Sequence, residues 1–203
     1  MGSKTQVANI AYGRIGSALQ LSNVETDRSR QAIIARTFLD DDIAYVLRDF
    51  PWPWATAYAD LALVGGTAST PVNGDWQYSY RYPSQCAFFR RIVVAGLGRN
   101  NPNPPAFRIG RDAQGRLIYT NQELAGGKYT AVITGIEEFD PMAFSMLAWK
   151  LGAGLAPSQS RIKGMAEQCM QMYEIEKTKA QSRALNESQQ EQPIESEFTR
   201  ARD

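Results

Sequence analysis

The chain has 203 residues, 43% of them hydrophobic and 10% aromatic, which is enough apolar surface for one domain or two small ones. Its 22 basic and 21 acidic residues leave a net charge of +1, and this argues against a dedicated nucleic-acid-binding protein, which would carry a basic excess. Histidine is absent, which excludes Ser-His-Asp and Cys-His catalysis and histidine-based zinc sites.

Apolar periodicity predicts two helices in the first 50 residues. Residues 4–20 repeat an apolar side chain every four positions, at Val7, Ala11, Ile15 and Leu19. A second helix is expected to begin at a cap, Thr26 or Asp27, and to end near Asp49. It contains the acidic triplet 40–42. Consecutive helical side chains point in different directions, so we interpret the triplet as a solvated face rather than a Mg²⁺ or Ca²⁺ site.

The segment 47–55 follows, with two prolines and two tryptophans in four positions. Proline lacks the backbone donor that a helix needs and restricts the residue before it, so the second helix must stop here. Each tryptophan has a large apolar surface that favours burial. The segment therefore predicts a rigid corner that organises the fold. We expect its aromatic core to contain Phe50, Trp52, Trp54, Trp76 and Tyr78.

The middle of the chain favours strands. A glycine-rich loop at 65–75 precedes residues 76–83, where aromatic and polar side chains alternate with the period of a half-buried strand. The aromatic positions are Trp76, Tyr78, Tyr80 and Tyr82. Further short strands are expected at 88–95, 107–110, 116–120 and 129–134. Residues 76–135 therefore predict a small antiparallel sheet.

Helical signals return after residue 138. Asp140 and Pro141 form a cap followed by proline at the first helical position, and Pro157 is expected to close that helix. Ser158 then caps a fourth helix. Beyond Tyr173 the chain becomes polar, too poor in apolar side chains to order itself alone. Its good helix formers could extend the fourth helix up to about Glu191, before Pro193 breaks it.

These elements together predict an α+β fold. It is mainly a bundle of about four helices, with a small antiparallel β domain inserted between the second and third helices and an extended C-terminal arm. The expected divisions are residues 1–55 and 139–175 for the two halves of the bundle, 56–138 for the β domain and 176–203 for the arm.

The order of these motifs resembles the head-to-tail adaptor family of tailed phages, also called tail tubular protein A or head-completion proteins. The resemblance covers roughly residues 5–175. The matching segments are Leu47-Arg48-Asp49-Phe50-Pro51-Trp52-Pro53-Trp54-Ala55, Trp76-Gln77-Tyr78-Ser79-Tyr80-Arg81-Tyr82-Pro83, Ile118-Tyr119-Thr120-Asn121, Tyr129-Thr130, Phe139-Asp140-Pro141-Met142-Ala143-Phe144 and the helix 148–156.

The resemblance implies a structural protein of the virion, assembled in the bacterial cytoplasm and placed at the head–tail junction. Family members form a ring, commonly of twelve copies, under the portal protein. The ring closes the filled head, surrounds the DNA channel without reading sequence and carries the tail nozzle or tail tube. The resemblance implies no enzymatic activity, catalytic residue, metal, cofactor or membrane partner. The C-terminal segment would dock on the portal, through Arg183, Ile194, Phe198, Arg200 and Arg202.

Two other classes of function stay open on the sequence alone. Glu137 and Asp140 are carboxylates that a peptidoglycan-cleaving hydrolase of the virion would use as acid and base. The Trp76–Tyr82 aromatic alternation would serve a nucleic-acid-binding module as a stacking platform for bases.

Overall fold

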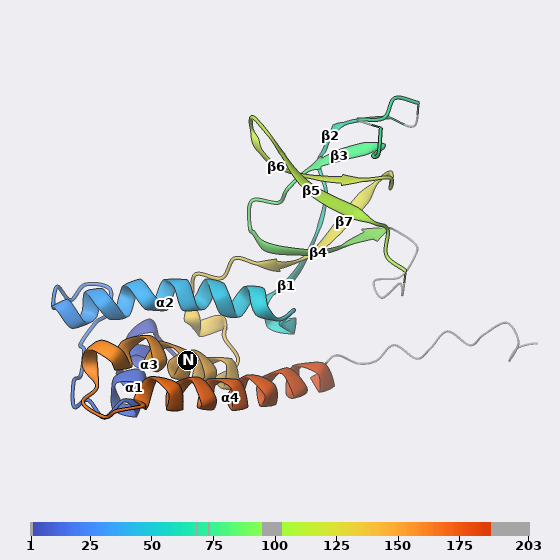
Figure 1. Ribbon diagram of the computed structural model, residues 1–203. Helices are drawn as coiled ribbons and strands as arrows, with labels where there is room; N and C mark the ends of the chain where they lie inside the picture. The colour runs from blue at the N-terminus through green and yellow to red at the C-terminus, as the bar shows by residue number, and fades with distance from the viewer. Residues whose placement is uncertain (1, 68, 73, 95–102, 188–203) are drawn as a thin grey trace, which may run out of the picture.

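The computed structural model describes residues 2–67, 69–72, 74–94 and 103–187. Their fold is α+β, as the sequence predicts (Figure 1). We call the helices together the helical unit and residues 56–135 the β unit. The helical unit consists of α1 (Lys4–Arg14), α2 (Arg30–Asp49), the short helices η1 (Pro53–Ala55) and η2 (Ile136–Glu138), α3 (Pro141–Gln159) and α4 (Met165–Glu187). The strands are β1 (Thr56–Asp60), β2 (Leu63–Gly65), β3 (Tyr78–Arg81), β4 (Cys86–Val94), β5 (Phe107–Asp112), β6 (Gly115–Thr120) and β7 (Ala125–Ala131).

Local backbone chemistry moves the first two helix ends from where the sequence placed them. α1 stops at Arg14 rather than near residue 20, because Gly16 takes a positive φ of 75° that turns the chain out of the helix. α2 is capped by Ser29, whose hydroxyl accepts from the backbone N–H of Ala32, and not by Thr26 or Asp27. Asp27 instead accepts from the backbone N–H of Ser29, in the turn before the cap.

The last two helices differ from expectation in the same way. α3 begins as predicted, with the Asp140 carboxylate accepting from the backbone N–H of Met142. Pro157 does not close it: the helix continues to Gln159, because a proline in the last turn removes a single donor. Ser158 consequently lies inside α3. α4 begins at Met165, after Gly164 with a φ of 74°.

The β unit is two antiparallel sheets rather than the one that the sequence predicts. One has the strand order β1-β7-β4 and the other β2-β3-β6-β5. β1 and β2 come from residues before the predicted sheet, which begins at residue 76. Both sheets contribute to one aromatic core, which contains Tyr78, Tyr80, Phe89, Ile92, Ile118 and Tyr129.

A second core lies in the helical unit, between α1, α2, α3 and α4. Small residues allow its helices to approach closely. A Cβ added at Gly152, for instance, would lie 3.4 Å from the Cys169 sulfur and 3.5 Å from Ile15. The guanidinium of Arg14 joins α1 to α3, donating to the Ser145 carbonyl at 2.8 Å and lying 4.0 Å from the centre of the Trp149 ring.

The Pro-Trp corner connects the two units. Trp52 is 1% exposed, and its indole N–H donates to the carbonyl of Val46 at 2.8 Å. Phe50, Trp54 and Phe139 complete an aromatic cluster around it, with ring centres 4.6–5.8 Å apart from neighbour to neighbour. Trp76 and Tyr78 do not belong to this cluster, contrary to the prediction. Tyr78 lies in the core of the β unit, and Trp76 lies beside a surface hollow with Pro71 and Asn121.

Arg90 on β4 ties the β unit to the end of α2. Its guanidinium donates to the carbonyls of Leu47, Arg48 and Phe50 at 2.9–3.2 Å, and to the Thr130 hydroxyl at 2.9 Å. The last carbonyls of a helix have no partner within it, and a cation there also favours the helix dipole. Arg90 of β4 therefore caps the C-terminal end of α2, where the chain continues into the proline-containing corner.

The acidic triplet is only partly solvated, which corrects the sequence interpretation. Asp40 and Asp41 are exposed, but the Asp42 side chain is 14% exposed and lies 3.5 Å from the Lys150 ammonium of α3. One oxygen of Asp42 has no hydrogen-bond partner in the described structure. Burial raises the pKa of this carboxyl to about 6, and Lys150 offsets part of the rise.

None of the helices in the described residues combines the length and the apolar character that crossing a membrane requires.

Candidate assembly surfaces

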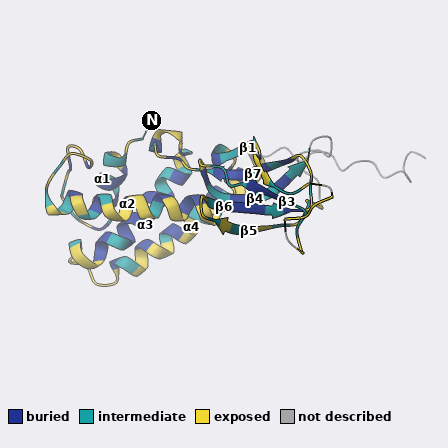
Figure 2. Cartoon of the chain, turned by 90° about the horizontal axis from the view of Figure 1, so that it is seen from above, coloured by how far each residue is buried: buried dark blue, intermediate teal, exposed yellow. Residues whose placement is uncertain are grey.

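The outer face of α4 presents a stripe that the helical core does not use. The inward face of this helix buries Cys169, Tyr173, Ala180 and Ala184. The outward face carries Ile175, Thr178, Ser182 and Leu185, all exposed and spaced by three, four and three residues (Figure 2). This is the spacing by which one helix packs along another in a coiled coil. We call these four residues the α4 stripe.

The polar atoms of the α4 stripe are already satisfied. The Thr178 hydroxyl donates to the carbonyl of Glu174, and the Ser182 hydroxyl to that of Thr178, both at 2.9 Å. The side chains of the stripe are therefore either small or apolar. Ile175, one of the apolar ones, is 47% exposed. A shallow hollow of about 540 Å³ runs along it, bordered by Lys179 and Arg183. Such a surface suits close contact with another helix.

Ion pairs fix α4 against the rest of the bundle. Lys177 lies 3.6 Å from Asp49 at the end of α2 and 2.7 Å from Glu174 of its own helix. Tyr173 is 1% exposed, and burial raises the pKa of its phenol. The ammonium groups of Lys150 and Lys177 each lie 5.3 Å from its ring centre. The orientation of the α4 stripe is therefore set by buried contacts on the opposite face.

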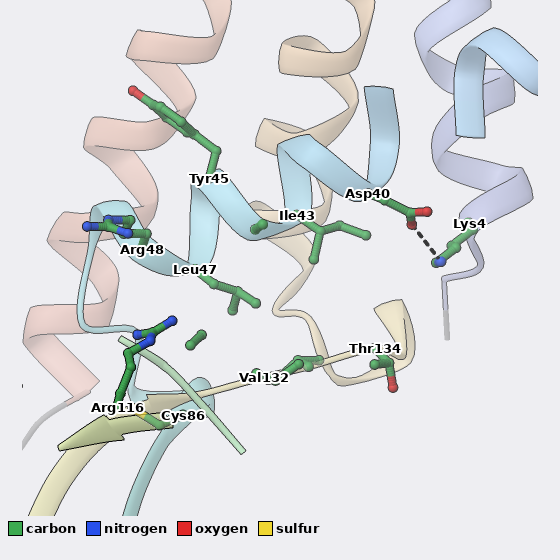
Figure 3. Close-up of a pocket in the computed structure, with 13 residues that line it drawn as sticks. Lys4, Asp40, Ile43, Tyr45, Leu47, Arg48, Cys86, Arg116, Val132 and Thr134 are labelled. Atoms are coloured by element: carbon green, nitrogen blue, oxygen red, sulfur yellow. Dashed lines mark hydrogen bonds and ion pairs between the residues drawn. The ribbon is translucent and has the colours of Figure 1, made fainter. Parts of the chain in front are cut away.

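A second candidate surface is a groove of about 570 Å³ between α2 and the β unit (Figure 3). Its floor consists of Ile43 and Leu47 from α2, and of Cys86 and Ile133 from the β side, all buried. Exposed Tyr45, Arg48, Arg116, Val132 and Thr134 form its rims. We call this the α2–β groove.

The two ends of the α2–β groove differ in charge. At one end Lys4 is neutralised by Asp40 at 2.9 Å and Glu25 at 3.0 Å. At the other, neither Arg48 nor Arg116 forms an ion pair with a carboxylate of the described residues. Their guanidinium groups lie over aromatic rings instead, 5.1 Å from the centre of Phe88 and 4.6 Å from that of Tyr82. This end of the groove is positive.

Sequence reasoning found α4 but not the groove. Arg48 stands inside the Pro-Trp motif, and Arg116 in a predicted strand, with no local pattern that joins them. Arg48 lies near the end of α2 and Arg116 lies on β6, and both reach the same end of the groove because the β unit folds back over α2 (Figure 3). A signal was present only in the charge of the β unit, where residues 56–135 hold eight basic and four acidic side chains, a net charge of +4.

Of the predicted portal-docking residues, the described structure contains one. Arg183 is exposed at the border of the α4 hollow. Ile194, Phe198, Arg200 and Arg202 lie outside the described residues. Residues 176–187 fall within the range assigned to the arm but belong to helix α4, in agreement with the expected extension of the fourth helix.

The structure gives other roles to several residues of the two alternative functions. Asp140 caps α3 through its carboxylate, and Glu137 is exposed in η2. Tyr78 and Tyr80 are 4% and 3% exposed, so their rings are not available as a platform for bases. No cluster of three or more potential metal ligands occurs among the described residues.

A scan against models of known protein families finds no match for this chain, and a search of curated proteins likewise finds none that match.

Proposed function

We propose that the chain is the subunit of a ring-shaped head-to-tail adaptor in a tailed phage, seated between the portal protein and the tail nozzle or tube. The ring would surround the DNA channel, close the filled head and carry the tail. The order of motifs along residues 5–175 supports the family, and the surfaces described above support assembly.

The observation that carries this proposal is the α4 stripe. A helix whose apolar face is fully used by its own core leaves a polar outer face. α4 instead carries a second stripe with coiled-coil spacing, already free of unsatisfied hydroxyls. If the α4 stripe of each subunit packs against a different surface of the next subunit, this head-to-tail contact generates a ring when the rotation closes.

The joint between the two units adds support. Arg90 holds the β unit to the end of α2 through the carbonyls of Leu47 and Phe50, and the Thr56 hydroxyl of β1 donates to the carbonyl of Trp52 at 2.7 Å. A connector between a portal and a tail must hold its two ends in a fixed relative orientation, and a rigid joint between the two units serves that purpose. Two units on a loose linker would not.

Negative-stain imaging of the purified chain, alone and mixed with the portal ring of the same phage, tests the proposal. The expected result is a closed ring of twelve copies, commonly found in the family, seated on one face of the portal. Portal rings that stay bare at saturating amounts of folded chain would contradict the proposal. A zymogram on peptidoglycan serves as the parallel test for the hydrolase class.

A further inference from the structure

The α2–β groove combines an apolar floor with charged rims. Its floor is apolar, with Ile43, Leu47 and Ile133 lying beneath the rims. A ligand for it must bring apolar side chains. Pockets of this kind combine an apolar lining with a few polar groups that fix orientation.

The charge of the groove specifies those polar groups. Arg48 and Arg116 lie at the same end and have no carboxylate partner in the described part of the chain. Arg111 lies directly opposite Arg116 in the β5–β6 pairing, and like charges opposite one another destabilise a sheet. An occupant with carboxylates would relieve this repulsion and form charge-assisted bonds to arginine.

One stretch of the chain has the matching chemistry. Residues 191–198 read Glu-Gln-Pro-Ile-Glu-Ser-Glu-Phe and contain three acidic and no basic side chains. In an extended peptide alternate side chains share a face. Ile194 and Phe198 would then face the apolar floor, while Glu195 and Glu197 face the other way, toward a basic rim.

We propose that residues 191–198 of one copy bind in the α2–β groove of a neighbouring copy. The proposal rests on the ring assembly proposed above, which brings copies side by side. Within one chain, α2 stands between α4 and the β unit, and the Lys177–Asp49 pair holds α4 on that far side (Figure 1). The mixing experiment below separates a neighbour's groove from the chain's own groove, because only the former would link two copies. The proposal assigns the acidic stretch to a second copy rather than to the portal.

Complementary charge reversal in the full-length chain tests this pairing. One variant carries Arg48→Glu and Arg116→Glu, and the other carries Glu195→Arg and Glu197→Arg. Each variant alone sets like charges against each other, and we expect self-association in sedimentation velocity to weaken at least about tenfold. In a 1:1 mixture, opposite charges meet only between different chains, so association should return to near the wild-type level.

The controls separate this pairing from misfolding and from other occupants. Arg161→Glu with Lys163→Glu, at the distant turn between α3 and α4, should leave self-association unchanged, and thermal melting should show that every variant is folded. A wild-type chain that stays monomeric at all concentrations, or a mixture no stronger than its components, overturns the proposal. If rings form on the portal but the mixed variants do not associate, only the binding of residues 191–198 in the groove is refuted. If the mixed variants associate but no rings form on the portal, only the adaptor function is refuted.

Discussion

The helical unit and the β unit reach stability by different means. The helical core uses small side chains that let helices approach closely, with buried alanines on α1, α2, α3 and α4. The β unit uses large aromatic side chains from two sheets, among them Tyr78, Tyr80 and Phe89. The first unit keeps a spare apolar stripe on α4, while the second carries a net charge of +4. The helices therefore leave an exposed apolar surface, whereas the strands concentrate positive charge.

The largest expected effect is the loss of the joint between the units. Trp52→Ala removes a buried indole and its bond to Val46, and should lower the free energy of unfolding by about 3–5 kcal/mol. The half-buried Trp54 is the matched control, and Trp54→Ala should cost about half as much because less surface is lost. Chemical denaturation measures both. Equal, small losses would show that the corner does not organise the fold.

Arg90→Gln should weaken the coupling between the two units, so that they unfold separately. It leaves the final carbonyls of α2 without their cationic donor, at a cost of about 2–3 kcal/mol. Calorimetry should then resolve two melting transitions in place of one. Arg108→Gln, on the exposed part of β5, is the control and should melt like the wild type. A single cooperative transition in the Arg90 variant would mean that the corner alone couples the units.

The pH dependence of stability should report on Asp42. Its folded pKa of about 6 exceeds the ordinary value of 3.8, so between these pH values the folded state holds a proton that the unfolded state has lost. Stability therefore falls as the pH rises from about 4 to about 6. Asp42→Asn should remove this slope and be more stable than the wild type at pH 7 by about 3 kcal/mol.

Exposed Asp41 provides the control for this experiment. Asp41→Asn should keep the wild-type slope, because that carboxylate is not buried beside Lys150. Melting temperatures measured from pH 4 to pH 7 decide the matter. If the Asp42 variant keeps the full pH dependence of stability, that dependence arises from another titratable group.

The elements themselves were largely readable from the sequence, because periodicity reports which face of a segment is buried. α2, the start of α3 and the Pro-Trp corner all carry strong local signals: regular apolar spacing, the Asp140-Pro141 cap and two prolines. Helix ends were less readable. Gly16 and Gly164 end or precede helices through a positive φ, and glycine is compatible with several conformations.

Long-range contacts were the part that the sequence did not reveal. The division into two sheets depends on pairing between β1 and β7, strands about 70 residues apart in the chain. Residue type alone groups Trp76 with the corner, whereas the fold places it beside a surface hollow with Pro71 and Asn121. Arg90, Arg48 and Arg116 acquire their roles from the same fold-back, which no local pattern encodes.

The central claim is that copies of this chain meet through the α4 stripe. Native mass spectrometry of portal-bound rings tests it most directly, comparing Ile175→Glu with Ile162→Glu, a control isoleucine that is 54% exposed outside the stripe. A charge at Ile175 faces the partner helix and should abolish rings without lowering the melting temperature, whereas the Ile162 variant should form them normally. Rings of unchanged mass and yield from the Ile175 variant would contradict the claim.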